Sequence, residues 1–426
     1  MSVVNQSVSA DINIERMWRR LEDLSGFTDA GRPWTRRAFS ADFFAARQWL
    51  TQQMQQAGLT VHVDAGGNLV GRLEGATPGA APIMTGSHTD TVFDGGRYDG
   101  IIGVLAGIEI AHTLTEHGVQ LQHPFEVVDF LSEEPSDFGV SCVGSRAMVG
   151  LLSPEMLAQK SPAGQTLSEA IESVGGRPKE LGRAIRGPGS VHSFIELHIE
   201  QGPVLEREQI PIGAVTDLVG IRRYRVVITG QADHSGTTPM DYRKDALLGA
   251  SILIQATNAK ARALNTDTAY VVSTVGYLTV LPNSSNAVPA SVEMMLEVRS
   301  NRNSVLESYG DELFAQIHAE IAAEGLTLDA SSVSYGEPAL FHPAVVELIG
   351  DAATERGYVS LRMPSGAGHD AAYLSKIAPS GMVFIPCLNG RSHCPEESIE
   401  PEQLKKGLQV TLDSVLKLDT IAGFAE

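Results

Sequence analysis

Three histidines and several carboxylates in this sequence follow short apolar stretches, where strands are expected to end. His88 and Asp99 lie in MTGSHTDTVFDGGRYDGIIG, His198 lies in ELHIEQGP, and His393 lies in NGRSHCPEE. Imidazole and carboxylate groups are ligands that zinc-class divalent cations accept in proteins. The pattern therefore predicts a metal site, although Asp99 would equally serve as the N-cap of a helix beginning near Gly100.

Two adjacent carboxylates, Glu133 and Glu134, end another apolar stretch in FLSEEPSDFG. Neighbouring side chains on an extended chain point to opposite sides, so one can bind a metal while the other faces a water molecule. Taken alone, the pair would fit a solvated acidic turn better than a metal site. With the residues above, three histidines and two carboxylates suffice for two cations about 3.5–4 Å apart, provided that one carboxylate bridges them.

Seven other histidines lack such neighbours. We expect ordinary surface or hydrogen-bonded roles for them. They are His62, His112, His117, His123, His192, His318 and His342.

The composition predicts a soluble protein with two domains. A chain of 426 residues, 43% of them hydrophobic, exceeds what one core usually covers. The formal charge of −19 disfavours nucleic acid as a partner. The N-terminal segment MSVVNQSVSADINIERMWRR lacks the pattern of a targeting signal, no stretch is long enough to span a bilayer, and three scattered cysteines make no disulfide framework. We therefore expect a cytoplasmic protein without a membrane partner.

Alternating helices and strands must position these chemical groups. Between residues 41 and 150, amphipathic helical stretches alternate with apolar strands, a pattern typical of an α/β layer whose ligand sites lie beyond the strand ends. Around residue 216 the pattern changes to several strands and two long helices, which predicts a separate α+β unit. We therefore expect one domain formed by residues 1–215 and 332–426, interrupted by an inserted domain at 216–331.

Six motifs together resemble the amidase, hydantoinase and carbamoylase family of binuclear metallohydrolases. They are GSHTDTVFDGGRYDGIIGVLAG, the paired glutamates, ELHIEQGP, DHSGTTPMDYRKDAL, SGAGHDAAYL and GRSHCPEE. The family includes N-carbamoyl-L-amino acid hydrolases, allantoate amidohydrolases and β-ureidopropionases, and it is similar in fold to aminoacylase and carboxypeptidase-type metallopeptidases. The resemblance covers nearly the whole chain and implies a mixed-sheet α/β catalytic domain with an inserted α+β lid or dimerisation domain.

The resemblance also implies roles for the candidate ligands. His88 and His198 match ligands of a first metal, Asp99 matches a bridging ligand, and Glu134 and His393 match ligands of a second metal. Glu133 matches the general base. Zinc is the expected metal, and manganese, cobalt or nickel would also suit nitrogen and oxygen ligands.

Further residues match the family's substrate-binding groups. His234 corresponds to a histidine of the inserted domain that helps stabilise the oxyanion, and Asn286 and Arg299 correspond to residues that hold the substrate carboxylate. Gln201 resembles a residue near the ureido group, and Gly368 and His369 are expected at a helix start that lines the cleft. The family is usually a homodimer through the inserted domain, and the sequence leaves open whether His234 acts in its own subunit or in the partner.

The sequence departs from the family pattern at several places near the site. Pro135 and Asp137 follow the paired glutamates, where many relatives have Gly and Arg, and Glu297 replaces a common aspartate. Arg391 and Cys394 flank His393, where relatives often have small or apolar residues. Two interpretations of Arg391 remain open: it contacts a second acidic group on the substrate, or it pairs with Glu396 or Glu397.

The resemblance implies a metal-dependent amidohydrolase acting on N-carbamoyl-L-amino acids. The products would be the amino acid, ammonia and carbon dioxide, formed through a metal-bound hydroxide with Glu133 as the base. Allantoate or a β-ureido acid is an alternative substrate, and a dipeptidase or N-acyl amino acid hydrolase is a second class of enzyme. A binding protein without catalysis is disfavoured, because a solute binder has no need for a base beside two metals.

Overall fold

The computed structural model describes residues 11–424, which form two compact units. The first unit comprises the residues up to 216 together with 340–363 and those from 369 onward, and the second unit comprises 217–339 and 364–368. The first ten residues of the N-terminal segment, in which the sequence shows no targeting pattern, lie outside the described part. Among the described residues, no helix is long and apolar enough to cross a membrane.

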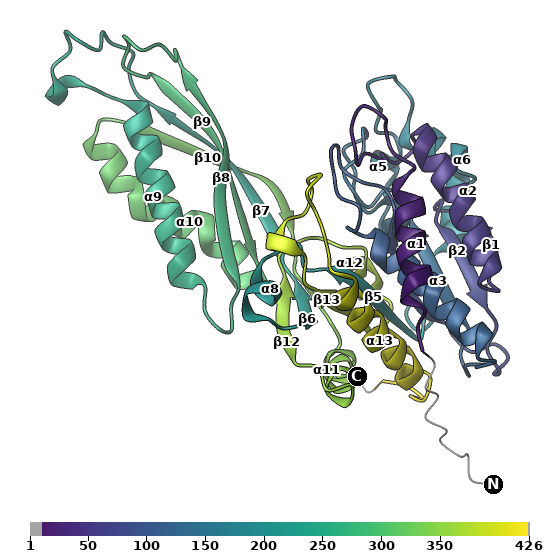
Figure 1. Cartoon of the computed structure of the whole chain (residues 1–426). Coiled ribbons are helices and arrows are strands. Elements are labelled where there is room, and N and C mark those ends of the chain that lie inside the picture. Colours follow the sequence, from purple (N-terminus) through teal and green to yellow (C-terminus); the bar gives the residue numbers. More distant parts are fainter. Residues whose placement is uncertain (1–10, 425–426) are drawn as a thin grey trace. The chain divides into compact units, whose positions relative to one another are not determined.

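The first unit is built on a mixed nine-stranded sheet (Figure 1). Its strands, in spatial order, are β1 (Thr60–Val63), β2 (Leu69–Leu73), β4 (Phe125–Phe130), β3 (Ile83–His88), β5 (Ser193–Ile199), β13 (Ser380–Ile385), β6 (Ile212–Leu218) and β11 (Ala339–Leu340), with β12 (Ser360–Ser365) paired to β6. The four central strands, β4, β3, β5 and β13, run parallel to one another. Every residue of these four strands is buried, as expected for parallel strands covered on both faces.

Helices cover this sheet and extend its core. The helix α3 packs against β3, β4 and β5, and α13 packs against β5 and β13. The longer helices are α1 (Ile14–Ser25), α2 (Ala41–Gln56), α3 (Ile101–Glu116), α11 (Pro343–Glu355) and α13 (Pro401–Leu418). The short ones are α4 (Val143–Met148), α5 (Pro154–Leu157), α6 (Leu167–Ser173), η1 (Pro178–Glu180), α7 (Leu181–Ala184), α8 (Val204–Glu208), α12 (Ala371–Leu374) and η3 (Leu388–Gly390). The fold class predicted from the sequence, a mixed-sheet α/β domain with a separate α+β unit, is confirmed.

The second unit is an antiparallel sheet with two helices on one face (Figure 1). Its elements follow the order β7 (Gly220–Thr229), η2 (Met240–Tyr242), α9 (Ala246–Leu264), β8 (Val271–Leu281), β9 (Ser291–Ser300), α10 (Asn303–Ala323) and β10 (Thr327–Gly336). The strands lie in the order β10, β7, β9, β8, which is the split βαβ arrangement. Alternate residues of β9 are buried against the helices, so this unit has its own core.

The second unit extends past the end predicted at residue 331. The strand β10 continues to Gly336 and pairs with β7 down to Ile221. The loop 364–368 also belongs to this unit. The prediction stopped early because most residues of β10 are exposed, so the sequence there carries no apolar run.

Candidate metal centre and active site

Four neighbouring strands deliver the predicted site residues to one edge of the first sheet. His88 is the last residue of β3, and His198 is the penultimate residue of β5. Glu133 and Glu134 follow the end of β4, and His393 follows the end of β13. Because the four strands are parallel and adjacent, their carboxyl ends meet at the same edge, which is where open α/β sheets bind ligands.

Asp99 lies at the centre of this group. Its Oδ1 is 3.2 Å from Nε2 of His198, and its Oδ2 is 2.9 Å from Nε2 of His393. Nε2 of His393 also lies 3.1 Å from Oε1 of Glu134. Two potential ligand sets therefore share Asp99: one contains His88 and His198, and the other contains Glu134 and His393.

Glycine at position 100 allows this convergence. Gly100 has a φ of 69°, and a Cβ atom there would lie 2.3 Å from Nε2 of His88. The helix α3 begins at Ile101 with Gly100 as its N-cap. Asp99 is thus not the N-cap, and its carboxylate faces the histidines instead.

The two buried histidines are oriented by backbone carbonyl groups. Nδ1 of His88 lies 2.9 Å from the carbonyl oxygen of Asp90, and Nδ1 of His198 lies 2.8 Å from that of Ile199. A proton on each Nδ1 would satisfy these carbonyl groups and leave each Nε2 without a proton. This is the arrangement by which proteins usually orient a metal-binding imidazole. Nε2 of His198 then accepts a hydrogen bond from the backbone N–H of Gly100 at 3.1 Å, beside Oδ1 of Asp99.

Asp90 positions the paired glutamates, a role that the sequence analysis missed. Its Oδ1 accepts a hydrogen bond from the backbone N–H of Glu133, and its Oδ2 accepts one from that of Glu134, both at 3.1 Å. Oε2 of Glu133 lies 3.6 Å from Nε2 of His88. A signal existed in the sequence, because Asp90 follows His88 by two residues at the same strand end.

Glu397 connects the loop of Asp99 with the loop of His393, and the sequence analysis also missed this. Its carboxylate accepts hydrogen bonds from the backbone N–H groups of Tyr98 and Asp99, at 2.8 and 3.1 Å. It also accepts a hydrogen bond from Oγ of Ser392 at 2.7 Å. Glu397 was considered only as a partner of Arg391, because nothing in the sequence relates it to residues almost 300 positions away.

The centre holds more buried carboxyl groups than buried cations can balance. Burial raises the pKa of Asp90 and of Asp370 to about 7. Burial also raises the pKa of Glu196 to about 8 and that of Glu133 well above its usual value. These shifts show that ionising the carboxyl groups without a nearby positive charge is unfavourable. A divalent cation would supply that charge.

The histidines respond to the same excess of negative charge. Hydrogen bonds with Asp99 and Glu134 raise the pKa of His393 to about 11. Burial alone would lower the pKa of His88, but the surrounding carboxylates, Glu133 first among them, raise it well above its usual value. The donor set is thus imidazole nitrogen and carboxylate oxygen in negatively charged surroundings, buried except at His393, and it fits one or two divalent cations.

Two further predicted residues also lie at this centre. Nε2 of Gln201 donates a hydrogen bond to Oδ1 of Asp99 at 3.0 Å. The ring of His369 packs edge-on against that of His198, with centroids 4.4 Å apart, and His369 is buried. The predicted helix start at His369 is slightly wrong: α12 begins at Ala371 with Asp370 as its N-cap.

The remaining predicted residues belong to the second unit. His234 and Asn286 are neighbours there, because the N–H of Ser235 donates to the carbonyl oxygen of Asn286 at 3.0 Å. Arg299, at the end of β9, lies apart from them and donates to Glu297 and to the carbonyl oxygen of Gly366, at 2.7 and 2.8 Å.

The backbone at Gly368 borders open space: a Cβ atom there would meet no other atom within 4 Å. Gly368 belongs to the same short loop, 364–368, as the carbonyl group that Arg299 contacts.

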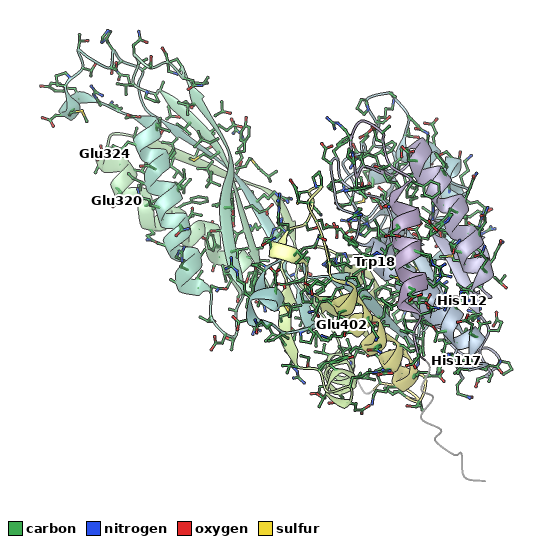
Figure 2. All side chains as sticks on the ribbon, in the orientation of Figure 1. Trp18, His112, His117, Glu320, Glu324 and Glu402 are labelled. Carbon is green, nitrogen blue, oxygen red and sulfur yellow. The ribbon has the colours of Figure 1, made fainter. Side chains whose placement is uncertain are left out.

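Residues outside the centre have ordinary partners. Arg391 pairs with Glu396 at 3.0 Å, and Asp137 lies 3.5 Å from Arg37. His112, on α3 (Figure 2), contacts Arg20 and Glu116. These contacts fit the ordinary role expected for His112.

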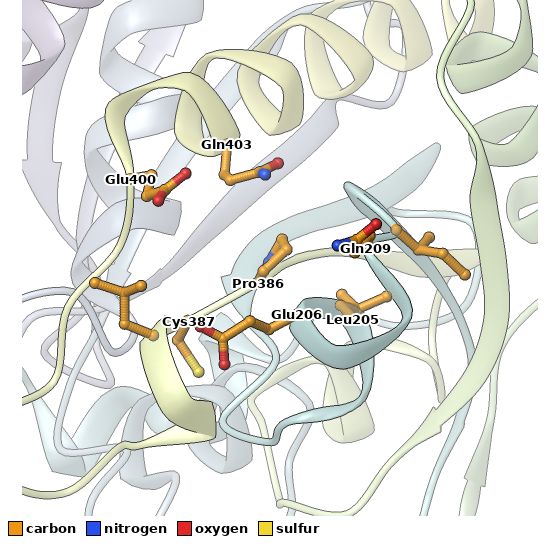
Figure 3. Close-up of a pocket in the computed structure, with 9 residues that line it drawn as sticks. Leu205, Glu206, Gln209, Pro386, Cys387, Glu400 and Gln403 are labelled. Atoms are coloured by element: carbon orange, nitrogen blue, oxygen red, sulfur yellow. The ribbon is translucent and has the colours of Figure 1, made fainter.

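A cavity of about 300 Å³ in the first unit is separate from these residues (Figure 3). Its wall includes Glu206 of α8, Gln403 of α13 and the buried Cys387. None of the predicted site residues lines it.

Comparisons with known proteins agree with this arrangement. The profile of the Peptidase family M20/M25/M40 matches residues 84–417. The chain belongs to the M20 family. An N-carbamoyl-L-amino-acid amidohydrolase of Paenarthrobacter aurescens is 37% identical over 406 residues, covering 95% of this chain and 98% of the relative. A ureidoglycolate hydrolase of Arabidopsis thaliana is 34% identical, covering 97% and 88%.

A solved structure of similar fold is an amidase of the hydantoinase/carbamoylase family from Burkholderia multivorans. It has a TM-score of 0.90 and 37% identity, and the match covers 96% of this chain and 98% of that one. The family resemblance read from the six motifs is therefore confirmed. This M20 protein is a hydrolase of amide C–N bonds, and M20 enzymes are metal-dependent.

Proposed function

We propose that this M20 enzyme hydrolyses N-carbamoyl-L-amino acids to the amino acid, ammonia and carbon dioxide. The observation that carries the proposal is the geometry of Asp99, whose two oxygens face His198 and His393, with Glu133 close by. The names of the amidohydrolase relatives support the carbamoyl substrate class.

Two cations would be held by residues of the first unit. We propose His88, Asp99 and His198 for one ion and Asp99, Glu134 and His393 for the other, with zinc as the expected metal and manganese, cobalt or nickel as alternatives. Bound divalent cations polarise a carbonyl oxygen and lower the pKa of a water molecule.

Glu133 is the proposed proton carrier. It takes a proton from the attacking water at Oε2, the oxygen nearer His88, and later delivers it to the leaving nitrogen. Its burial favours the protonated form, because a buried carboxylate pays a desolvation penalty. A raised pKa makes the carboxyl group a better acceptor in the first step and keeps the proton available for the second.

Substrate contacts are proposed for both units. Arg299 is proposed to hold the substrate carboxylate, since a guanidinium group binds carboxylates through paired hydrogen bonds. Asn286, which lies apart from Arg299 and beside His234, is proposed as a second contact to this carboxylate. In Arg299, Nε donates to the carboxylate of Glu297 and Nη1 donates to the carbonyl oxygen of Gly366. These two hydrogen bonds fix the orientation of the guanidinium group. His234 is proposed to stabilise the oxyanion, Gln201 to contact the ureido group, and Gly368 and His369 to line the cleft.

We also propose that the enzyme forms a homodimer through the second unit. The strand β8 is an edge of its sheet, and the side chains of Tyr277 and Leu281 on it are exposed by 52% and 58%. An apolar edge strand is a favourable surface for pairing with a second copy. Light scattering coupled to gel filtration should give twice the monomer mass, and a monomer would remove this proposal.

The deciding experiment is a substrate panel with the manganese- or zinc-reconstituted enzyme. We expect ammonia release from N-carbamoyl-L-amino acids. Ureidoglycolate is the second candidate because two relatives are named for it, and allantoate and β-ureidopropionate complete the ureido set. N-acetyl amino acids and dipeptides are followed by release of free amino acid. Turnover of only these last compounds would contradict the carbamoyl assignment.

A further inference from the structure

The two carboxylate oxygens of Glu133 have different surroundings. Oε2 faces Nε2 of His88 at 3.6 Å, whereas Oε1 lies 3.5 Å from Sγ of Cys142. Only 8% of Glu133 is exposed, so these neighbours largely define how its carboxylate is oriented. A base is effective when the accepting oxygen is aimed at the proton and the group cannot rotate away.

The backbone holds Cys142 firmly in this place. Its N–H donates to the carbonyl oxygen of Glu133 at 2.8 Å, and the next two N–H groups donate to the carbonyl oxygens of Ser132 and Leu131 at 3.0 and 2.8 Å. Cys142 has a φ of 52°, a left-handed conformation that a non-glycine residue adopts only where its surroundings impose it. The position of the thiol relative to Glu133 therefore follows from the fold.

The thiol at this position is a hydrogen-bond donor. Burial raises the pKa of Cys142 well above its usual value, and the negative charge of Glu133 raises it further. A protonated thiol next to a carboxyl oxygen donates its S–H, and although this donor is weak, the contact is buried. In contrast, Sγ of Cys387 donates to a neutral carbonyl oxygen, that of Gly202, at 3.8 Å.

We propose that Cys142 is a positioning residue for the base: its S–H donates to Oε1 of Glu133 and leaves Oε2 as the oxygen that exchanges the proton. The inference rests on the proposed role of Glu133 in catalysis. It adds that the side chain of Cys142 determines which carboxylate oxygen of Glu133 exchanges the proton.

The test compares Cys142→Ala, Cys142→Ser and the control Cys387→Ala in the metal-loaded, full-length enzyme. Cys142→Ala should lower kcat by about three- to tenfold, the effect of losing one modest hydrogen bond, with KM and metal content unchanged. Cys142→Ser keeps a donor and should recover most of kcat. Cys387→Ala also removes a buried thiol and should leave kcat at the parent value.

An unchanged kcat in Cys142→Ala would overturn the proposal. So would an equal loss in the alanine and serine variants, because that result would mean that packing rather than hydrogen bonding matters. The variant Glu133→Gln distinguishes a failure of the proposed role of Glu133 from a failure of the proposed role of Cys142. If this variant stays active, the proposed role of Glu133 fails; if it is inactive while Cys142→Ala is unimpaired, only the role of Cys142 fails.

An infrared measurement keeps the test decisive if Cys142→Ala does not fold. In a chain whose other two cysteines are replaced by alanine, the S–H stretching band reports Cys142 alone. Hydrogen bonding lowers the frequency of this band, so Glu133→Ala should shift it upward. A band that does not move would contradict the contact on which the proposal depends.

Discussion

The sheet surface of the second unit and the candidate metal centre of the first unit balance their charges in different ways. In the second unit, Glu293 pairs with Arg225 and Glu297 pairs with Arg223, both at 2.6 Å and on partly exposed side chains. At the candidate metal centre of the first unit, carboxylates such as Asp99 and Glu134 are buried and meet histidines instead. On the sheet surface, each of these carboxylates already has an arginine partner. The buried cluster instead needs a cation from outside the chain to balance its negative charge.

Metal removal should produce the largest difference between the units. Chelation should abolish activity and increase deuterium uptake in the segments 86–100 and 391–397, because the repelling carboxylates lose their shared cation. At a free metal concentration about 1,000 times the dissociation constant, the stabilisation lost is about 4 kcal/mol. Deuterium uptake in β7 and β9 should not change. An equal increase in deuterium uptake in both units would show that metal binding is not confined to the first unit.

Replacing the proposed base should have the next largest effect. Glu133→Gln should lower kcat by about 10²- to 10⁴-fold, because the amide cannot accept the proton. Metal content, measured by inductively coupled plasma mass spectrometry, should stay near the parent value because Glu133 is outside the proposed ligand sets. Glu172→Gln on the exposed surface of α6 is the matched control. Retained activity would remove Glu133 as the base.

Arg299→Ala tests whether the second unit contributes a substrate contact. It should raise KM about 10- to 100-fold for substrates with a free carboxylate, since charge-assisted hydrogen bonds contribute about 1.5–3 kcal/mol. Arg225→Ala is the control, because Arg225 lies on the same sheet and pairs with Glu293. An unchanged KM in Arg299→Ala would leave Arg299 with only its contacts to Glu297 and Gly366.

The sequence was sufficient to predict that residues at several strand ends lie close together. His88, His198 and the two glutamates each follow an apolar run, and parallel strands bring such ends together. The same local reasoning predicted two separate structural units, since hydrophobic periodicity changes where the second one begins.

The hydrogen bonds that side chains make to the backbone of distant segments could not be predicted, even for Asp90, whose place at a strand end was visible in the sequence. Asp90 accepts hydrogen bonds from N–H groups 43 and 44 residues away, and Glu397 accepts them from 298 and 299 residues away. Such contacts leave no periodic pattern, because they depend on loop conformations after the strands have assembled. The contact between Cys142 and Glu133 joins residues only nine positions apart, but it too depends on a loop conformation that the sequence pattern does not indicate.

The smallest effect is expected at Arg391, for which the sequence left two interpretations open. Its guanidinium group pairs with Glu396, and both side chains are about half exposed, at 48% and 61%. An exposed ion pair contributes about 0–1 kcal/mol, so Arg391→Ala should change the free energy of unfolding by less than about 1 kcal/mol. KM for N-carbamoyl-L-methionine should change less than about twofold, within the range expected of a surface substitution. N-carbamoyl-L-aspartate distinguishes the two interpretations: a tenfold rise in KM for this substrate alone would show that Arg391 exchanges Glu396 for a second substrate carboxylate.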